Sequence, residues 1–233
     1  MNDESCSGEV YLDMTGVDKK VLNTRLSDMV QEMKDYFGID IAKEPFRISP
    51  GIHYFMGGIY VDIDHQSSVK DLYAAGECAC QYHGANRLGG NSLLGAIYGG
   101  RVAAENISAD NDERIVEINR DPEDLKVDPN FASELVGVMS EGLGIIRDEG
   151  KLNEALAKIE DMLNKENHNQ EEKNRLLMAK AMLMSALERK ESRGAHYRED
   201  HPKEDEKYRK TTMASYDGKI KIAFADIPER RDA

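Results

Sequence analysis

Two patterns of apolar residues mark the start of the chain. Residues 9–14 alternate apolar and polar side chains, which predicts a short strand. Between residues 21 and 37 the apolar positions recur at helical spacing, which predicts one helix. Gly38 suits the residue just past the end of that helix, because glycine adopts left-handed backbone angles without strain. Pro45 and Pro50 interrupt the chain after this glycine, so residues 1–50 indicate a loose strand-and-helix unit without an evident core of its own.

The glycine-rich segment after Pro50 predicts two strands and a helix. Residues 58–64 alternate apolar and polar, as a half-buried strand does. Residues 71–77 form a short apolar run that ends in glycine and an acid, which is typical of a buried strand. Residues 92–106 then favour a helix, and the pair Gly99 and Gly100 favours close packing of that helix against another backbone.

Helical periodicity dominates the C-terminal half. It predicts three amphipathic helices that pack as a bundle, at about residues 131–146, 152–163 and 171–193. An acidic, weakly patterned linker at 109–129 precedes them. The tail is mostly charged, and within it Asp217 and Gly218 predict the turn of a hairpin.

Charge and cysteine content exclude several classes of protein. The formal net charge of −13 argues against a nucleic-acid partner, which needs a basic surface, and against direct binding to an anionic membrane. No apolar run approaches the roughly 20 residues of a membrane-spanning helix, and the acidic N-terminus is unlike a signal peptide. Three cysteines, of which two form a C-x-C pair, favour a reducing compartment and predict neither disulfides nor a metal site.

Arg87 and His53 are the candidate ligands for a small anion. A guanidinium matches a carboxylate with two parallel hydrogen bonds, and the glycines at 89 and 90 let backbone approach a ligand beside Arg87. His53 can donate a hydrogen bond to a second carboxylate. Together they indicate a dicarboxylate. Each residue taken alone also fits an ordinary surface arginine or a structural histidine.

The start of the helix after Arg87 is a candidate anion site. Asn91 or Ser92 suits the N-cap, and the free N–H groups of the first turn make that helix end positive. A reduced flavin carries negative charge that such an end would stabilise, although an ordinary capped helix has the same spacing. Glu77 follows an apolar run, where acids in dinucleotide folds accept hydrogen bonds from sugar hydroxyls. His83, between these features, fits packing better than chemistry.

Four signatures resemble the flavoprotein subunit of succinate dehydrogenases and fumarate reductases, and they extend the likeness over about residues 9–212. They are His53–Gly58, Leu72–Glu77, His83–Leu94 and Glu191–Pro202. The resemblance implies an α+β fold made of the end of a capping domain, the C-terminal part of a Rossmann-like FAD domain, a linker, a three-helix bundle and a β tail. The corresponding residues are 1–50, 51–108, 109–129, 130–193 and 194–233.

The resemblance also implies roles for individual residues. His53 and Arg87 would bind a C4 dicarboxylate, and Glu77, Ser92 and Leu93 would contact FAD, the last two at the flavin ring. The Glu191–His196 segment would serve packing only. The implied reaction interconverts succinate and fumarate, with an iron–sulfur subunit and a membrane anchor as partners. Those partners would place the chain in the cytoplasm, peripherally at the inner membrane face.

Several family features have no counterpart in the sequence. These are the Gly-x-Gly-x-x-Gly turn, the histidine that carries covalent flavin, and the capping-domain arginine that delivers the proton. We therefore expect the C-terminal portion of such a flavoprotein, from a truncation or a split pair, without the N-terminal half of the flavin domain. In isolation it should not turn over substrate, since no catalytic proton donor is present.

Two other hypotheses stay open. L-aspartate oxidase resembles the same region, although Met56 and Gly90 favour the reductase pattern. A non-catalytic binding or assembly protein would explain the missing catalytic parts. Retention of His53 and Arg87 weighs mildly against that second alternative.

Overall fold

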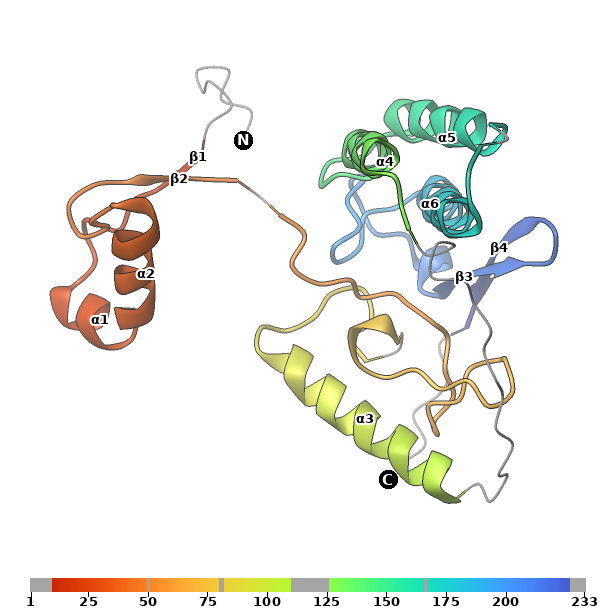
Figure 1. Ribbon diagram of the computed structural model, residues 1–233, viewed down its shortest axis with the longest axis horizontal. Helices are drawn as coiled ribbons and strands as arrows, with labels where there is room; N and C mark the ends of the chain where they lie inside the picture. Colours follow the sequence, from red (N-terminus) through yellow and green to blue (C-terminus); the bar gives the residue numbers. More distant parts are fainter. Residues whose placement is uncertain (1–9, 50, 80–81, 110–125, 166, 227–233) are drawn as a thin grey trace. The chain divides into compact units, whose positions relative to one another are not determined.

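The structure is a computed structural model with helices and short two-stranded sheets (Figure 1). It describes residues 10–49, 51–79, 82–109, 126–165 and 167–226. The chain divides into two compact units, residues 1–55 and 56–233.

The first unit is a small sheet with two helices inserted between its strands. Strand β1 (Val10–Leu12) pairs antiparallel with β2 (Phe46–Ile48), in the register that sets Tyr11 opposite Arg47. Helices α1 (Lys19–Thr24) and α2 (Ser27–Phe37) lie between them in the sequence. Helix α2 ends at Gly38 with a φ of 70°, so the predicted glycine terminus is confirmed.

The single helix predicted over residues 21–37 is wrong, because the chain forms two helices there. The Leu26 N–H donates to the Val21 carbonyl, five residues back, instead of continuing the i to i−4 ladder. The Thr24 hydroxyl also donates to the carbonyl four residues before it, a bond that weakens a helix from within. The apolar spacing survives this break because both helices turn their apolar sides to the same interior.

That interior is a core, and the expectation that this segment lacks one is wrong. Leu22, Ile41 and Phe46 are buried together. Half-buried apolar side chains surround them: Leu12, Met14, Val17, Leu26, Met29, Val30, Met33, Ile39 and Ala42. Several of these residues lie past the helices, in a segment without periodicity, and the sequence pattern therefore missed their contribution.

In the second unit, the strands predicted at 58–64 and 71–77 are not formed in the part of the chain that the structure describes. These segments meet neighbours only at single bridges, which pair Ile59 with Ala79, Val61 with Ser67, and Gln66 with Tyr73. Left-handed backbone angles at His65 and Asp71 turn the chain before a ladder can extend. The 3-10 helix η1 (Gly76–Cys78) takes up the last two residues of the predicted strand at 71–77.

Helix α3 (Asn91–Ala109) comes next, where a helix was predicted. Gly99 lies buried against the Tyr82 hydroxyl and the His65 ring, so its close contact is with side chains and not with another backbone. Tyr82 also bonds the His65 ring, at 3.0 Å between Oη and Nδ1. These contacts fix one face of α3 against the segment before it.

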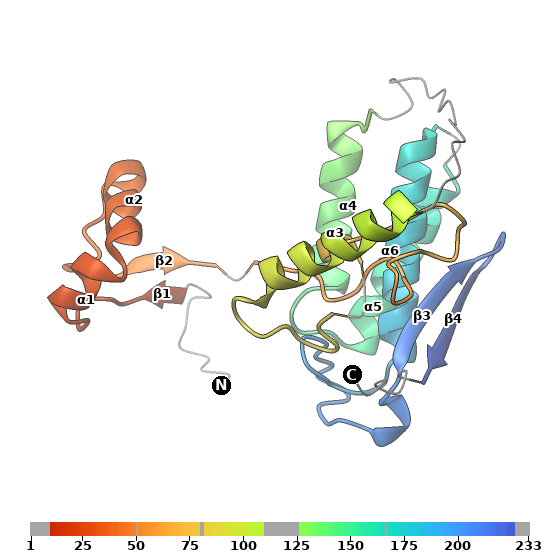
Figure 2. The same cartoon turned by 90° about the horizontal axis from the view of Figure 1, so that it is seen from below.

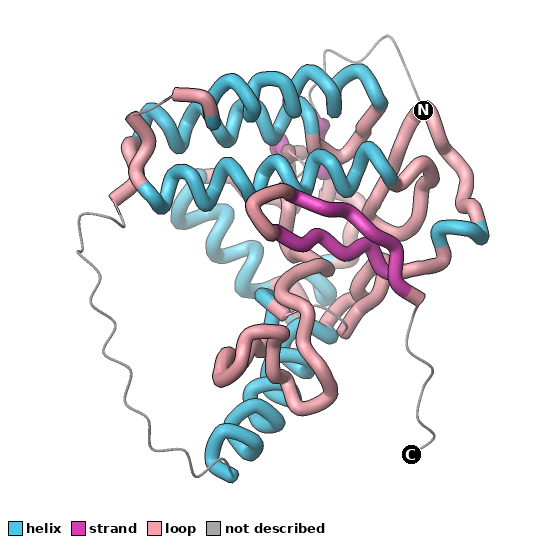
Figure 3. The backbone as a smooth tube through the Cα atoms, turned by 90° about the vertical axis from the view of Figure 1, so that its right-hand side faces the viewer, coloured by secondary structure: helices cyan, strands magenta, loops and turns pink. Residues whose placement is uncertain are grey.

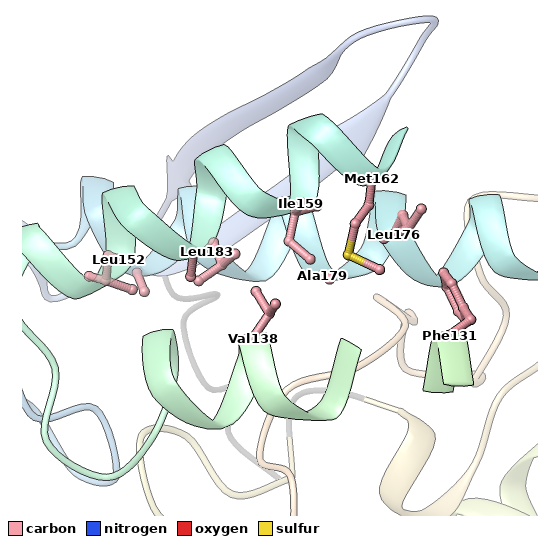
Figure 4. Packing of buried hydrophobic residues seen from close by; sticks show 10 residues of the cluster. Phe131, Val138, Leu152, Ile159, Met162, Leu176, Ala179 and Leu183 are labelled. Atoms are coloured by element: carbon pink, nitrogen blue, oxygen red, sulfur yellow. The ribbon is translucent and has the colours of Figure 1, made fainter. Parts of the chain in front are cut away.

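Three further helices pack side by side (Figure 2). They are α4 (Pro129–Gly142), α5 (Glu149–Leu163) and α6 (Gln170–Glu188), one at each predicted place. Their shared core is apolar, and Figure 4 shows its side chains pointing between the helices. The buried members are Phe131, Val138, Leu152, Ala155, Ile159, Met162, Leu176, Ala179, Leu183 and Ala186.

A hairpin lies along α6 (Figure 3). Strands β3 (Thr211–Tyr216) and β4 (Ile220–Ala225) pair antiparallel, and Gly218 takes a φ of 68° in the turn, so the predicted hairpin is confirmed. A short 3-10 helix, η3 (Glu206–Tyr208), precedes it. Among the described residues we find no helix with the length and apolar character needed to cross a bilayer, and no cluster of metal-ligating side chains.

Replacing Asn169 with alanine should lower the free energy of unfolding by about 1 kcal/mol. The Asn169 side chain accepts a hydrogen bond from the Glu172 N–H at 2.9 Å, and Glu172 bonds back to the Asn169 N–H, forming a capping box at the start of α6. Urea denaturation measures the change. Asn153→Ala, at an exposed position inside α5, is the control and should be neutral or slightly stabilising.

Candidate functional site

Arg87 lies in a loop, residues 83–90, that leads from η1 into α3; we call it the Arg87 loop. Gly84 and Gly90 take positive φ angles of 59° and 82°, which bend the backbone at both sides of the arginine. The Arg87 N–H donates to the Asn86 side chain at 2.9 Å, and its guanidinium donates to the Leu88 carbonyl at 3.2 Å. The arginine is half-buried, so its position is partly set by its own loop.

Helix α3 begins directly after this loop. Its first residue is Asn91, whose N–H donates to the Leu88 carbonyl at 3.2 Å. Ser92 is half-buried in the first turn, whereas the Leu93 side chain is 72% exposed within the described part of the chain. A polar donor group and an apolar surface therefore lie next to each other at the positive end of a long helix.

Glu77 belongs to η1, which packs against α3. Gly76 takes a positive φ of 76°, and a Cβ built there would lie 3.5 Å from the Ala96 side chain, so the two elements approach closely at this glycine. The Glu77 side chain is exposed. The second unit thus brings Arg87, Ser92 and Leu93 onto one loop and helix, with Glu77 on the adjoining turn.

His53 lies in the first unit, in a segment without regular structure after β2, and is exposed there. The predicted pairing of His53 and Arg87 around one dicarboxylate stays a prediction.

The sequence pattern did not predict the buried charges in the tail. Glu191 is fully buried and accepts hydrogen bonds from Arg189 and Arg193. Burial alone would raise the pKa of Glu191, but the hydrogen bonds outweigh it and hold the pKa below its ordinary value. Hydropathy cannot signal such residues, because each charge is buried only where an opposite charge meets it.

Arg198 is a second buried charge. Its guanidinium forms a bidentate pair with Asp200, at 2.7 and 2.6 Å, and donates to the Ala186 carbonyl at 2.8 Å. The hydrogen bonds from Arg198 hold the pKa of the Asp200 carboxyl far below its usual range. Through its bond to the Ala186 carbonyl, Arg198 ties the tail to the end of α6.

Comparison with known proteins assigns both parts of the chain to one family. A model of the FAD-binding domain matches residues 1–93, and a model of the fumarate reductase flavoprotein C-terminal region matches residues 132–230. These matches place the chain among the flavoprotein oxidoreductases, and FAD is the cofactor to which both the matching domain model and the relatives point.

The relatives are more specific. The succinate dehydrogenase flavoprotein subunit of Bacillus subtilis is 34% identical over 245 residues, covering 89% of this chain and 42% of that protein. An L-aspartate oxidase of Pyrococcus horikoshii is 41% identical over 167 residues, covering 71% and 34%. A quinol fumarate reductase structure from E. coli superposes with a TM-score of 0.77 at 29% identity, covering 97% and 46%.

The chain belongs to the succinate dehydrogenase/fumarate reductase flavoprotein family, and it spans less than half the length of these relatives.

Proposed function

We propose that the chain supplies the substrate-binding loop and part of the flavin site of an oxidoreductase that interconverts succinate and fumarate. The observation that carries this proposal is the placement of Arg87. A half-buried guanidinium lies on a glycine-bent loop that opens directly into the positive end of α3. Such a site would hold the carboxylate of a substrate next to an anionic cofactor.

Arg87 would bind one carboxylate through paired N–H donors, and His53 would donate to the other. Holding both ends of a planar C4 dicarboxylate would fix the central carbons in place for hydride transfer. The positive charge of the guanidinium would also draw electrons away from the alkene of fumarate. Both contributions belong to binding and orientation, and neither moves a proton.

The residues present fit part of an FAD site. The positive end of α3 suits negative charge on a reduced ring, the exposed Leu93 offers an apolar contact, and the exposed Glu77 carboxylate can accept hydrogen bonds from hydroxyls. FAD, when bound, would supply hydride donation and acceptance. Ser92, in the first turn, would add a hydroxyl beside the ring.

We further propose that other polypeptide segments complete this enzyme. The remainder of the flavin domain would supply the nucleotide cradle and the capping domain the proton donor, and without them the chain should not turn over substrate. By family resemblance, an iron–sulfur subunit and a membrane anchor would attach the assembly peripherally at the inner membrane face, in the cytoplasm.

A second candidate is an L-aspartate oxidase. It is favoured by the 41% identity of the Pyrococcus horikoshii protein over 71% of this chain. Both functions would use a dicarboxylate site, so the substrate that reduces the flavin separates them. Reduction by succinate supports the first function, reduction by L-aspartate supports the second, and reduction by neither supports a non-catalytic role.

Replacing Arg87 with alanine should weaken fumarate binding about 10- to 100-fold, the range expected when hydrogen bonds from a charged donor are removed. Fumarate is titrated into the flavoprotein reconstituted from this chain and a polypeptide carrying the remaining flavin-domain segments, and flavin absorbance reports binding. His53→Ala should cause a smaller loss. Arg87→Lys should bind with intermediate affinity, because lysine keeps the charge without the planar fork.

Arg101→Ala is the matched control. Arg101 is exposed on the same helix that follows the loop and pairs with Glu105 at 2.7 Å. Its removal should leave fumarate affinity unchanged. Equal affinities of the Arg87→Ala variant and the unmodified protein would contradict the proposed site.

A further inference from the structure

A turn in the tail, Arg193–His196, contacts the Arg87 loop. The Ala195 N–H donates to the Ala85 carbonyl at 3.0 Å, across more than a hundred residues of sequence. Gly194 takes a φ of 58°, and a Cβ built there would overlap the Ala85 carbonyl and approach the Ala85 side chain to 2.8 Å. Only glycine fits this contact without displacing the loop.

The turn itself is closed by its own backbone. The Arg193 N–H donates to the His196 carbonyl at 2.8 Å, and the His196 N–H donates to the Arg193 carbonyl at 3.0 Å. These reciprocal bonds hold Gly194 and Ala195 at the tip. The tip of the turn therefore has a defined backbone conformation.

Both ends of the turn are braced by buried polar groups. Glu191 accepts from the Arg193 guanidinium through two oxygens, each at 3.0 Å, and also accepts from the Asp205 N–H at 2.9 Å. The His196 ring accepts from Arg147 at 2.9 Å and donates to the Arg189 carbonyl at 3.1 Å. Burial lowers the pKa of His196 to about 4, which keeps the ring in the neutral form that this arrangement needs.

Most of the Arg87 loop lies at the surface. Ala85, Asn86, Leu88 and the three loop glycines are exposed, and the backbone is bent by left-handed residues at both sides of Arg87. A loop of this kind samples several conformations unless a contact from outside selects one. The Ala85 carbonyl, two residues before Arg87, receives that contact from Ala195.

We propose that the Arg193–His196 turn positions the Arg87 loop, so that Gly194 and Ala195 determine how well the arginine is placed for a dicarboxylate. Its effect on dicarboxylate binding rests on the proposed function. The mechanical link between turn and loop does not, and it is measured in the 233-residue chain alone.

Gly194→Asn is the test variant, because asparagine tolerates left-handed angles but carries the Cβ that meets Ala85. Gly218→Asn is its matched control, since Gly218 has a φ of 68° and open space where a Cβ would be. Amide hydrogen exchange, resolved by NMR, should be at least tenfold faster at Ala195, Arg87 and Asn91 in the Gly194 variant. It should be unchanged in the control and within α5 and α6 of both variants.

A folded Gly194→Asn chain with unchanged exchange in the loop would overturn the proposal. If this variant does not fold, amide exchange rates in the unmodified chain test the proposal instead. Loop and turn opening together would expose the amides of Arg193, Ala195 and His196 at one rate. Exchange at Ala195 at least tenfold faster than at Arg193 and His196 would mean that the loop opens alone, which also overturns the proposal.

Fumarate binding gives the functional arm of the test. In the reconstituted flavoprotein, Gly194→Asn should weaken binding about tenfold, because a misplaced binding group loses affinity even when it is present, and Gly218→Asn should not. Unchanged affinity with a loosened loop would overturn the role in positioning. No fumarate binding by the unmodified protein would instead reject the proposed function, and the exchange rates would still decide the link between turn and loop.

Discussion

Replacing Glu191 with alanine should lower the free energy of unfolding by about 3–5 kcal/mol, the usual cost of removing one partner from a buried ion pair. Glu191 is fully buried, and the side chains of Arg189 and Arg193 are only 12% and 19% exposed. Without the carboxylate, two guanidinium groups and the Asp205 N–H lose their acceptor in a region that water reaches poorly.

The loss should extend beyond the immediate pair. Arg189 also donates to the carbonyls of Tyr208 and Lys210, and its Nε donates to the Thr212 hydroxyl at 2.9 Å. The same arginine therefore links the end of α6 to β3 and to the segment before it. If Arg189 loses its fixed position, the hairpin should detach from the bundle, and the Arg193–His196 turn should loosen as well.

Urea denaturation at neutral pH, monitored by the far-ultraviolet circular dichroism of the helices, measures the change in the free energy of unfolding. Glu188→Ala is the matched control, because this acid is exposed three residues earlier in the chain, and its loss should stay within about 0.5 kcal/mol. Glu191→Gln should fall between the two, since the amide keeps one acceptor oxygen and loses the charge. A loss below about 1 kcal/mol for Glu191→Ala would show that the ion pairs are solvated and not structural.

Local signals predicted the helices of the second unit well. Each of α4, α5 and α6 carries an apolar face over several turns, and periodicity detects such faces without knowledge of the partner. The hairpin turn was predicted for a similar reason, because Asp217 and Gly218 specify a tight turn by themselves. These elements are determined by residues close together in the sequence.

Elements that depend on distant partners were predicted poorly. The segments around Ile59 and Tyr73 have the composition of strands, but a strand needs a neighbour along its length, and composition does not supply one. The core of the first unit was missed because Ile41 and Phe46 complete it from outside any periodic segment. In each case the deciding contact is not local.

In the candidate site, too, features set by neighbouring residues were predictable and features set by distant contacts were not. The glycines around Arg87 and the start of α3 can be identified from sequence, because positive φ angles and helix ends have local signatures. The contact between Ala195 and Ala85 has none. It depends on a buried charge network in the tail, which the sequence presents only as a run of acids and bases.

Acidification should destabilise this network through His196. The unfolded ring titrates near 6.5 and the folded ring near 4, so the folded state binds fewer protons between these values. The stability that the neutral ring contributes is fully present above pH 6.5 and is lost as the pH falls toward 4. The slope reaches about 1.4 kcal/mol per pH unit, which gives a loss of about 3 kcal/mol over the window.

Burial is the main cause of the low pKa, and the surrounding charges act in the same direction. Arg147, Arg189 and Arg198 all disfavour a second positive charge on His196, whereas the bond to the Arg189 carbonyl opposes them only in part. Protonation would also turn the ring nitrogen that accepts from Arg147 into a donor facing a donor. We therefore expect the Arg193–His196 turn to open before the helix bundle as the pH falls.

Urea denaturation of the unmodified chain and of His196→Gln, at about pH 7 and about pH 4.5, isolates this effect from the carboxylates that also titrate in acid. Glutamine can accept from Arg147 and donate to the Arg189 carbonyl, but it does not titrate. The unmodified chain should lose about 2 kcal/mol more than the variant between the two pH values. Equal losses would mean that His196 has the same pKa in the folded and unfolded chain, as a solvated ring does, and the support of the Arg87 loop would then have to come from Glu191 alone.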